Sequence, residues 1–207
     1  MERLILELEQ LSETLHHAVE KLPSSSLIGV DGYLCSGKST LAKILSQQFK
    51  LGCLSLDDFV LPLEEWPKDY QPEFPFRFMR SSEFYKSVQD LSSRGSCSYR
   101  PFDWVTRSVS PSAKTLELNE GVVVEGTGTL FPPFDELFAL KIFVESDEST
   151  ALQTAMERGD SSLREEWMNF ILPSADIYMK SNPQGRSDII VTGRTIFESE
   201  MESGRGK

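Results

Sequence analysis

A glycine-rich stretch near the start of the chain has the residue types and spacing of a loop that binds phosphate groups. Residues 32–40 read Gly-Tyr-Leu-Cys-Ser-Gly-Lys-Ser-Thr, which fits the pattern G-x-x-x-x-G-K-[ST]. Backbone N–H groups can converge on phosphate oxygens only where no Cβ intrudes, and the lysine adds a compact cation. We therefore expect a nucleotide triphosphate to bind here with Mg²⁺, and Ser39 to ligate the metal. The predicted nucleotide-binding residues are Gly32, Cys35, Ser36, Gly37, Lys38, Ser39 and Thr40.

Three carboxylates end apolar runs that have the length of buried strands. Asp57 and Asp58 come directly after residues 52–56, and Glu125 lies at the end of the run 121–126. Ligands of open α/β sheets bind at the carboxyl ends of the strands, so Asp57 and Glu125 should lie beside the phosphate loop, while Asp58, one residue on, should point in another direction. Glu125 also resembles the carboxylate that reaches Mg²⁺, directly or through water, in proteins with this loop.

The elements that must position these groups alternate along the chain. Strands are expected at 27–31, 52–56, 121–126, 140–144 and 188–191, and helices at 2–22, 41–49, 80–92, 147–158 and 162–180, the last bent or broken at Pro173. This order predicts a doubly wound α/β protein with a parallel sheet of about five strands and flanking helices. Residues 98–107 are expected to form a hairpin or paired edge strands.

The predicted domain organisation has three parts. Residues 1–24 form an N-terminal amphipathic helix, residues 25–197 a phosphate-loop domain, and residues 198–207 a flexible polar tail. The helix is expected to pack on its own domain, although its leucine spacing also fits a helical dimer. Within the domain, residues 57–121 form a substrate-binding insertion, and residues 147–180 form a lid with its helices.

The insertion begins with a segment crowded with aromatic residues. Residues 59–85 contain eight Phe, Tyr and Trp side chains, interrupted by four prolines. One interpretation is a pocket for a flat or sugar-like ligand, and the other is a small local core under a loop. The two are compatible.

Composition narrows the classes of partner. The chain has 207 residues, a net charge of −11 and three cysteines without C-x-x-C spacing, and its pI is about 4.7. These features argue against a general nucleic-acid or anionic-membrane surface and favour a reducing compartment. We expect a cytoplasmic protein with a small-molecule partner, and a homodimer is conceivable.

Arg158 lies where the two lid helices would join, close to Asp160 and Arg164. A basic residue on a helical segment beyond the fourth strand could close over a transferring phosphate. The alternative is a surface turn with local ion pairs.

Several motifs then match one family in order. They are residues 28–40 with Leu56–Phe59, Tyr99–Arg107, Val122–Gly126, Glu157–Asp160 and Ser187–Gly193. This set, spanning residues 27–193, resembles the uridine kinase-like family of P-loop kinases, which itself resembles phosphoribulokinase and bacterial pantothenate kinase. No N-K-x-D guanine-recognition motif is present.

The resemblance implies a kinase that transfers the γ-phosphate of ATP to a hydroxyl of a nucleoside or related polar metabolite. It implies that Asp57 is the catalytic base, that Lys38 and Arg158 act on the transferring phosphate, and that Glu125 helps to hold Mg²⁺. The implied substrate residues are Asp57, Asp58, Phe102, Asp103 and Arg107. Because Arg107 takes the place of a base-reading histidine, an anionic, sugar-like or pantothenate-like acceptor is one alternative. A nucleotide-binding regulatory protein is the other.

Overall fold

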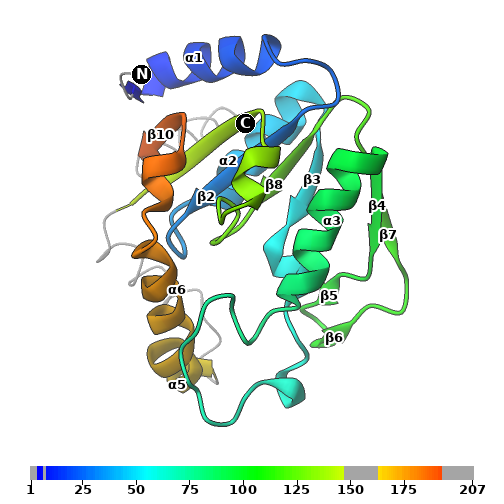
Figure 1. Cartoon of the computed structure of the whole chain (residues 1–207), viewed down its shortest axis with the longest axis vertical. Helices are drawn as coiled ribbons and strands as arrows, with labels where there is room; N and C mark the ends of the chain where they lie inside the picture. The colour runs from blue at the N-terminus through cyan, green and yellow to red at the C-terminus, as the bar shows by residue number, and fades with distance from the viewer. Residues whose placement is uncertain (1–3, 7, 147–162, 193–207) are drawn as a thin grey trace, which may run out of the picture.

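A six-stranded parallel sheet forms the centre of the computed structural model, which describes residues 4–6, 8–146 and 163–192 (Figure 1). The strand order is β1-β10-β9-β2-β8-β3. The strands are β1 (Leu4–Leu6), β2 (Leu27–Gly32), β3 (Gly52–Ser55), β8 (Val122–Glu125), β9 (Leu140–Glu145) and β10 (Ile189–Thr192). All five predicted strands are confirmed, because their near-continuous apolar runs suit strands that are buried on both faces.

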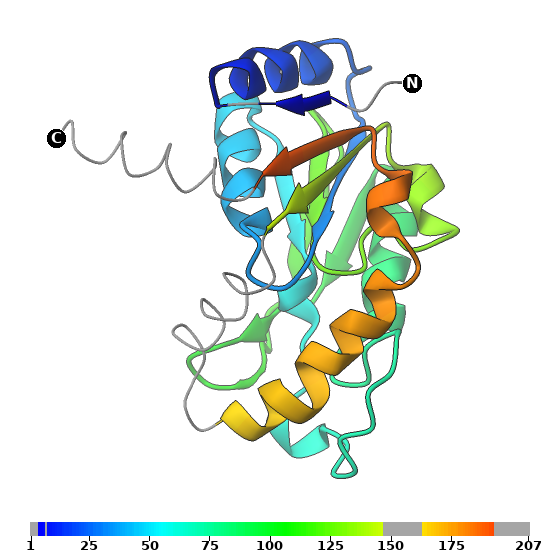
Figure 2. The same ribbon diagram turned by 90° about the vertical axis from the view of Figure 1, so that its left-hand side faces the viewer.

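Helices cover both faces of this sheet, which confirms the predicted doubly wound class. Neighbouring residues of β2 point to opposite sides, so Leu27 belongs to one core and Ile28 to the other. The first core includes residues of α3 (Ser81–Arg94) and α6 (Leu172–Met179). The second includes residues of α1 (Leu8–Glu20) and α2 (Lys38–Phe49). Figure 2 shows α1 at one end of the molecule and the segment leading into α6 at the other.

The prediction of a helix from residue 2 is wrong at its start. Residues 4–6 form β1, which pairs in parallel with Ile189–Val191 of β10, and the helix begins at Leu8. Pairing satisfies backbone groups along an otherwise open sheet edge, a long-range gain that helical periodicity does not reveal. Leu15 and Val19 are buried in the second core, so this part of α1 packs on its own domain as expected.

The insertion between β3 and β8 contains more regular structure than predicted. Two short 3₁₀ helices (Leu56–Phe59 and Leu63–Glu65) precede α3. A ribbon of two antiparallel strand pairs follows, in which β4 (Ser96–Tyr99) pairs with β7 (Lys114–Glu117), and β5 (Phe102–Asp103) pairs with β6 (Ser108–Val109). The hairpin therefore extends to residue 117, beyond the predicted 98–107. Its return strands are short and polar, so the apolar pattern of the sequence did not reveal them.

A continuous helical segment leads towards β10. It consists of α5 (Arg164–Glu166), a π-helical turn (Trp167–Ile171) and α6. Pro173 does not break it, because the wider turn precedes the proline and Pro173 occupies the first turn of α6, where a missing N–H is tolerated. The predicted helix 147–158, Arg158 and the tail 198–207 lie outside the described residues.

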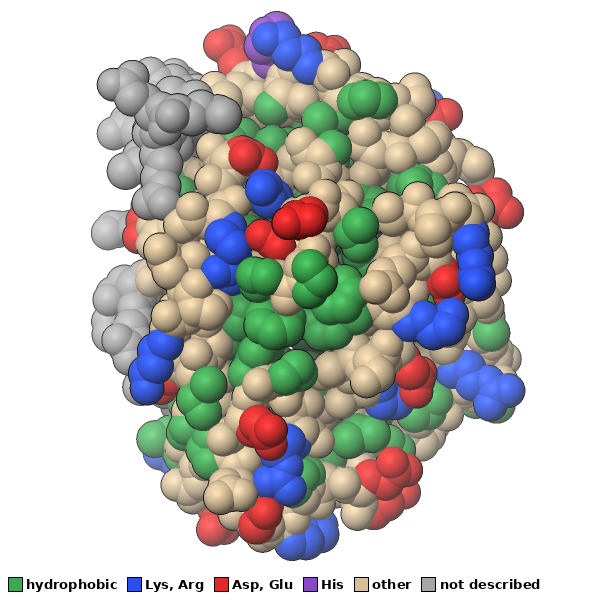
Figure 3. All heavy atoms as spheres, in the orientation of Figure 1, with side chains coloured by type: hydrophobic (Ala, Val, Ile, Leu, Met, Phe, Trp, Pro, Cys, Tyr) green, Lys and Arg blue, Asp and Glu red, His purple; other side chains and the backbone are tan. Residues whose placement is uncertain are grey.

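Charged side chains of both signs are interspersed over the face shown in Figure 3, and hydrophobic side chains gather in a hollow at its centre. A phosphate-bearing ligand must therefore be held by local groups rather than by a broad basic area of this face.

Within the described ranges, no helix combines the length and apolar character needed to cross a bilayer.

Candidate active site

The phosphate loop joins β2 to α2 in a backbone conformation that depends on two glycines. Gly32 has a φ of 153°, and a Cβ there would lie 2.3 Å from the carbonyl oxygen of Val144 and 2.7 Å from Ser36 Oγ. Gly37 has a φ of 101° and directly precedes α2. These positions therefore require glycine, and the loop brings the N-terminus of a twelve-residue helix to the site.

Lys38 and Ser36 place polar groups inside this loop. Lys38 is buried, and its Nζ donates a hydrogen bond to the carbonyl oxygen of Tyr33 at 2.6 Å. Ser36 Oγ is fully buried and has no hydrogen-bond partner among the described residues. A buried, unsatisfied hydroxyl is costly, so its presence beside a cationic lysine fits a loop that receives an oxygen-rich anion.

Glu125 ends β8 directly opposite the start of α2. Ser39 Oγ donates to both carboxylate oxygens at 3.3 Å, and Ser55 Oγ, from the end of β3, donates to Oε1. Burial, reinforced by the nearby negative charge of Asp57, raises the pKa of Glu125 to about 7. The structure thus brings the two predicted metal residues, Ser39 and Glu125, into contact.

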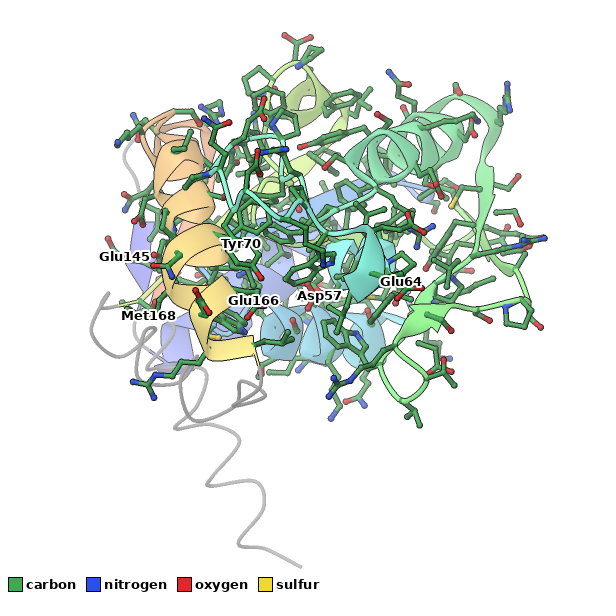
Figure 4. All side chains as sticks on the ribbon, turned by 90° about the horizontal axis from the view of Figure 1, so that it is seen from below. Asp57, Glu64, Tyr70, Glu145, Glu166 and Met168 are labelled. Carbon is green, nitrogen blue, oxygen red and sulfur yellow. The ribbon has the colours of Figure 1, made fainter. Side chains whose placement is uncertain are left out.

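Asp57 projects into the same space from the first turn of the 3₁₀ helix Leu56–Phe59. Ser55 Oγ caps this helix by accepting a hydrogen bond from Asp57 N at 3.2 Å. Asp57 is exposed, but the surrounding protein still removes part of the water around its carboxyl group. This desolvation raises the pKa of Asp57, and the positive charge of Lys38 opposes the shift. In Figure 4, Asp57 lies between the helix that carries Glu166 and the ribbon formed by β5 and β6.

Asp58 points away from Asp57, towards the ribbon. Its Oδ2 accepts hydrogen bonds from Tyr99 Oη at 2.7 Å and from Lys114 Nζ at 3.3 Å. Asp58 therefore fixes the ribbon to the end of β3 and does not line the cavity beside the phosphate loop. The substrate role predicted for Asp58 stays a prediction, which this position does not support.

A cavity of about 530 Å³ connects the phosphate loop with the insertion. Phe102 and Arg107, both predicted substrate residues, contribute to its lining. Asp103 does not, because its Oδ1 accepts hydrogen bonds from the backbone N–H groups of Val105 and Thr106 and stabilises the turn of the ribbon. Arg158, the predicted lid cation, lies outside the described residues.

Asp31 supports the phosphate loop from behind, a role that the sequence did not predict. It is fully buried at the end of β2, and its carboxylate accepts hydrogen bonds from Gly32 N, Gly128 N, Leu130 N and Tyr178 Oη. Burial raises its pKa, although these donors oppose the effect. Asp31 thereby ties the phosphate loop to α6 and to the loop after β8. The sequence signal that could have identified Asp31 is a carboxylate inside an apolar strand, one residue before the phosphate loop.

The residues present fit a magnesium ion held jointly with nucleotide phosphates. In the described part of the chain, no group of three or more His, Cys, Asp or Glu side chains could hold a metal ion by itself. Ser39 and Glu125 offer hydroxyl and carboxylate oxygens, and Mg²⁺ commonly takes one or two protein ligands together with phosphates and waters. The oxygen ligands thus suit Mg²⁺ only when the phosphates are also bound.

Solved structures with a similar fold are known, although their sequences differ widely from this one. A possible uridine kinase from Bacillus stearothermophilus is 16% identical, with a TM-score of 0.64 over 86% of this chain and 99% of that one. A candidate fructose transport system kinase from Silicibacter sp. TM1040 is also 16% identical, with a TM-score of 0.66 over 90% and 98%. D-glycerate 3-kinase from Cryptococcus neoformans var. grubii is 11% identical, with a TM-score of 0.51 over 91% and 96%.

The chain has the fold of the P-loop kinases. No protein-family model matches the sequence, and no curated protein is similar to it in sequence. At these identities the likeness establishes the fold alone, so the activity must be argued from the geometry of the site.

Glu125→Gln should stabilise the metal-free protein at pH 8 but not at pH 4. In the folded protein the pKa of Glu125 is about 7, above its ordinary value of 4.5. The wild type therefore loses stability as the pH rises from about 4.5 to 7, because the carboxylate ionises more easily in the unfolded chain than in its buried place. We expect the free energy of unfolding to rise by about 1–3 kcal/mol at pH 8. Urea unfolding at both pH values measures it, with exposed Glu120→Gln as control. An equal change in the free energy of unfolding at both pH values would contradict a raised pKa for Glu125.

Bound ATP should protect Cys35 from alkylation. Cys35 is partly exposed, has a φ of 57° within the phosphate loop and lines the cavity. An added group there would occupy the space that the phosphates need. Iodoacetamide modification followed by peptide mass spectrometry, with and without ATP, measures the protection. Modification at the same rate in both samples would show that the nucleotide does not cover Cys35.

Proposed function

We propose that the protein is an ATP- and Mg²⁺-dependent kinase that transfers the γ-phosphate to a hydroxyl group of a small molecule. One observation carries this proposal: Lys38, the Ser39–Glu125 pair and Asp57 line a single cavity from three different elements. Phosphoryl transfer needs a cation at the phosphates, oxygen ligands for the metal, and a carboxylate at the acceptor hydroxyl. Candidate residues for all three requirements line one cavity.

Each residue has a role that follows from its position. Backbone N–H groups of the loop and Lys38 would hold the β- and γ-phosphates, while Ser39 and Glu125 would hold Mg²⁺. The bound metal neutralises charge on the phosphate oxygens. Asp57 would orient the acceptor hydroxyl and accept its proton as the new O–P bond forms and the bond to the leaving ADP breaks. A raised pKa suits Asp57 to this task, because a base works best when its pKa is near the working pH.

The uridine kinase-like resemblance makes a nucleoside the first acceptor to consider. Phe102 could stack on a flat ring, and Arg107 on the same ribbon suits a carboxylate or phosphate, as expected for an anionic acceptor. A nucleotide-binding regulatory protein would bind ATP through the same loop without using Asp57.

An assay of ADP release tests the proposal. The protein would be incubated with ATP and Mg²⁺ and a panel of nucleosides, vitamins, sugars and simple alcohols, with the Lys38→Ala variant as control. Acceptor-dependent ADP release by the wild type alone supports a kinase. ATP binding without ADP release for any acceptor would support the regulatory alternative.

A further inference from the structure

The part of the cavity lining that comes from residues 60–79 of the insertion consists of large apolar side chains. Five of them, Val60, Trp66, Phe76, Phe78 and Met79, form what we call the aromatic wall. The rings of Phe76 and Phe78 are stacked, with centroids 5.2 Å apart and an interplanar angle of 23°. Trp66 packs against Phe78 at 5.6 Å. Because these rings also belong to the core, the wall is a fixed surface.

The polar groups of the aromatic wall are already engaged within the protein. Trp66 Nε1 donates to the carbonyl oxygen of Leu61 at 2.9 Å, and Phe78 O accepts from Leu61 N at 3.0 Å. Phe76 O accepts from Met79 N at 3.1 Å. A ligand lying on this wall therefore meets carbon surface, with these donors and acceptors unavailable to it.

Charge is confined to other parts of the cavity. Among its lining residues within the described ranges, the charged side chains are Lys38, Asp57, Glu125 and Arg107. The first three surround the phosphate position, and Arg107 is exposed on the ribbon. The charged side chains of the cavity thus come from α2, the 3₁₀ helix after β3, the end of β8 and the ribbon, and the aromatic wall carries none.

We propose that the phosphoryl acceptor is an amphipathic alcohol, in which a hydroxyalkyl group is attached to an aromatic or similarly flat apolar body. This inference rests on the proposed kinase function, because it places the hydroxyl at Asp57. The apolar body would then lie against the aromatic wall, where burial of carbon is favourable. A sugar that reached this wall, or a nucleobase lying on it, would bring further hydroxyls or polar ring edges, which would lose their hydrogen bonds to water without finding partners on the wall.

Binding can be measured without turnover, because all three tryptophans of the chain, Trp66, Trp104 and Trp167, line this cavity. We would titrate the protein with 3-phenylpropan-1-ol, glycerol, D-ribose and uridine, and follow tryptophan fluorescence. Phenylpropanol should bind at least about tenfold more tightly than glycerol or ribose, since a missing hydrogen-bond partner or apolar contact commonly changes affinity 10- to 100-fold. It should also support the greatest ADP release of the four compounds.

Met79→Gln tests the wall directly, because it keeps the side-chain length and adds an amide to the apolar surface. It should weaken phenylpropanol binding about tenfold. Met168→Gln is the matched control, since Met168 is 46% exposed and does not line the cavity. If Met79→Gln fails to fold in a thermal melt, the nearly isosteric Val60→Thr replaces it.

The outcomes separate the acceptor class from the kinase function. Phenylpropanol binding that depends on Met79, without ADP release for any acceptor, would support the apolar site and contradict the kinase. Tighter binding and faster ADP release with uridine or ribose would support the kinase and overturn the apolar acceptor. Fluorescence that responds to none of the four compounds would also overturn it.

Discussion

Asp57→Asn should lower kcat at least about a hundredfold while leaving ATP affinity nearly unchanged. The substitution keeps the shape of the side chain but removes the group that would accept the proton of the acceptor hydroxyl. General-base help is typically worth about 10²–10⁴-fold in rate. The backbone of Asp57 is held independently of its carboxylate, through the hydrogen bond from Asp57 N to Ser55 Oγ, so the loop should stay in place. Steady-state kinetics with a responsive acceptor, and ATP titration, measure the two effects.

Asp58→Asn is the matched control for this prediction. Asp58 is the next residue in the chain, but its carboxylate binds Tyr99 and Lys114 instead of facing the cavity. Its replacement should change kcat less than about tenfold. A larger loss of kcat for Asp58→Asn than for Asp57→Asn would mean that Asp57 is not the base.

Lys38→Ala should abolish measurable phosphoryl transfer while the protein remains folded. The γ-phosphate would lose its positioned cation, and Arg or Lys groups at this point stabilise charge in the transition state. Lys38 is buried, and its Nζ donates a hydrogen bond to the carbonyl oxygen of Tyr33 within the phosphate loop itself, so its removal should not disrupt the sheet.

Lys43→Ala provides the comparison, because Lys43 lies on the same helix but is exposed. It should retain wild-type activity. Circular dichroism of both variants would check that the fold is kept. Near-wild-type turnover by Lys38→Ala would mean that the loop does not hold the transferring phosphate.

The sequence predicted the parts of the site that depend on local pattern. The phosphate loop has fixed spacing, so Gly32, Lys38 and Ser39 could be placed before the fold was known. Glu125 and Asp57 could be placed beside it, because parallel strands bring their carboxyl ends to one edge of the sheet. The structure brings Ser39 and Glu125 together as this rule requires.

Features that depend on distant partners could not be predicted in the same way. Residues 4–6 become a strand only because the edge of β10 is available for pairing. Asp103 and Asp58 lie at positions in the sequence that suit substrate contacts. In the fold, the carboxylate of Asp103 instead accepts hydrogen bonds within a turn, and that of Asp58 accepts one from Tyr99. The aromatic residues of 59–85 serve both alternatives considered from the sequence, since Trp66, Phe76 and Phe78 belong to the core and also line the cavity.

The most direct test of the account is to follow the γ-phosphate itself. ATP labelled with ¹⁸O in the γ-phosphoryl group would be incubated with Mg²⁺, the wild-type protein and the most responsive acceptor, and the products analysed by mass spectrometry. We predict that the label appears in a phosphate ester of the acceptor, in an amount equal to the ADP formed, and that Asp57→Asn gives at most about a hundredth of this rate. Label found only in inorganic phosphate, with the acceptor unchanged, would contradict the assignment of this site to phosphoryl transfer.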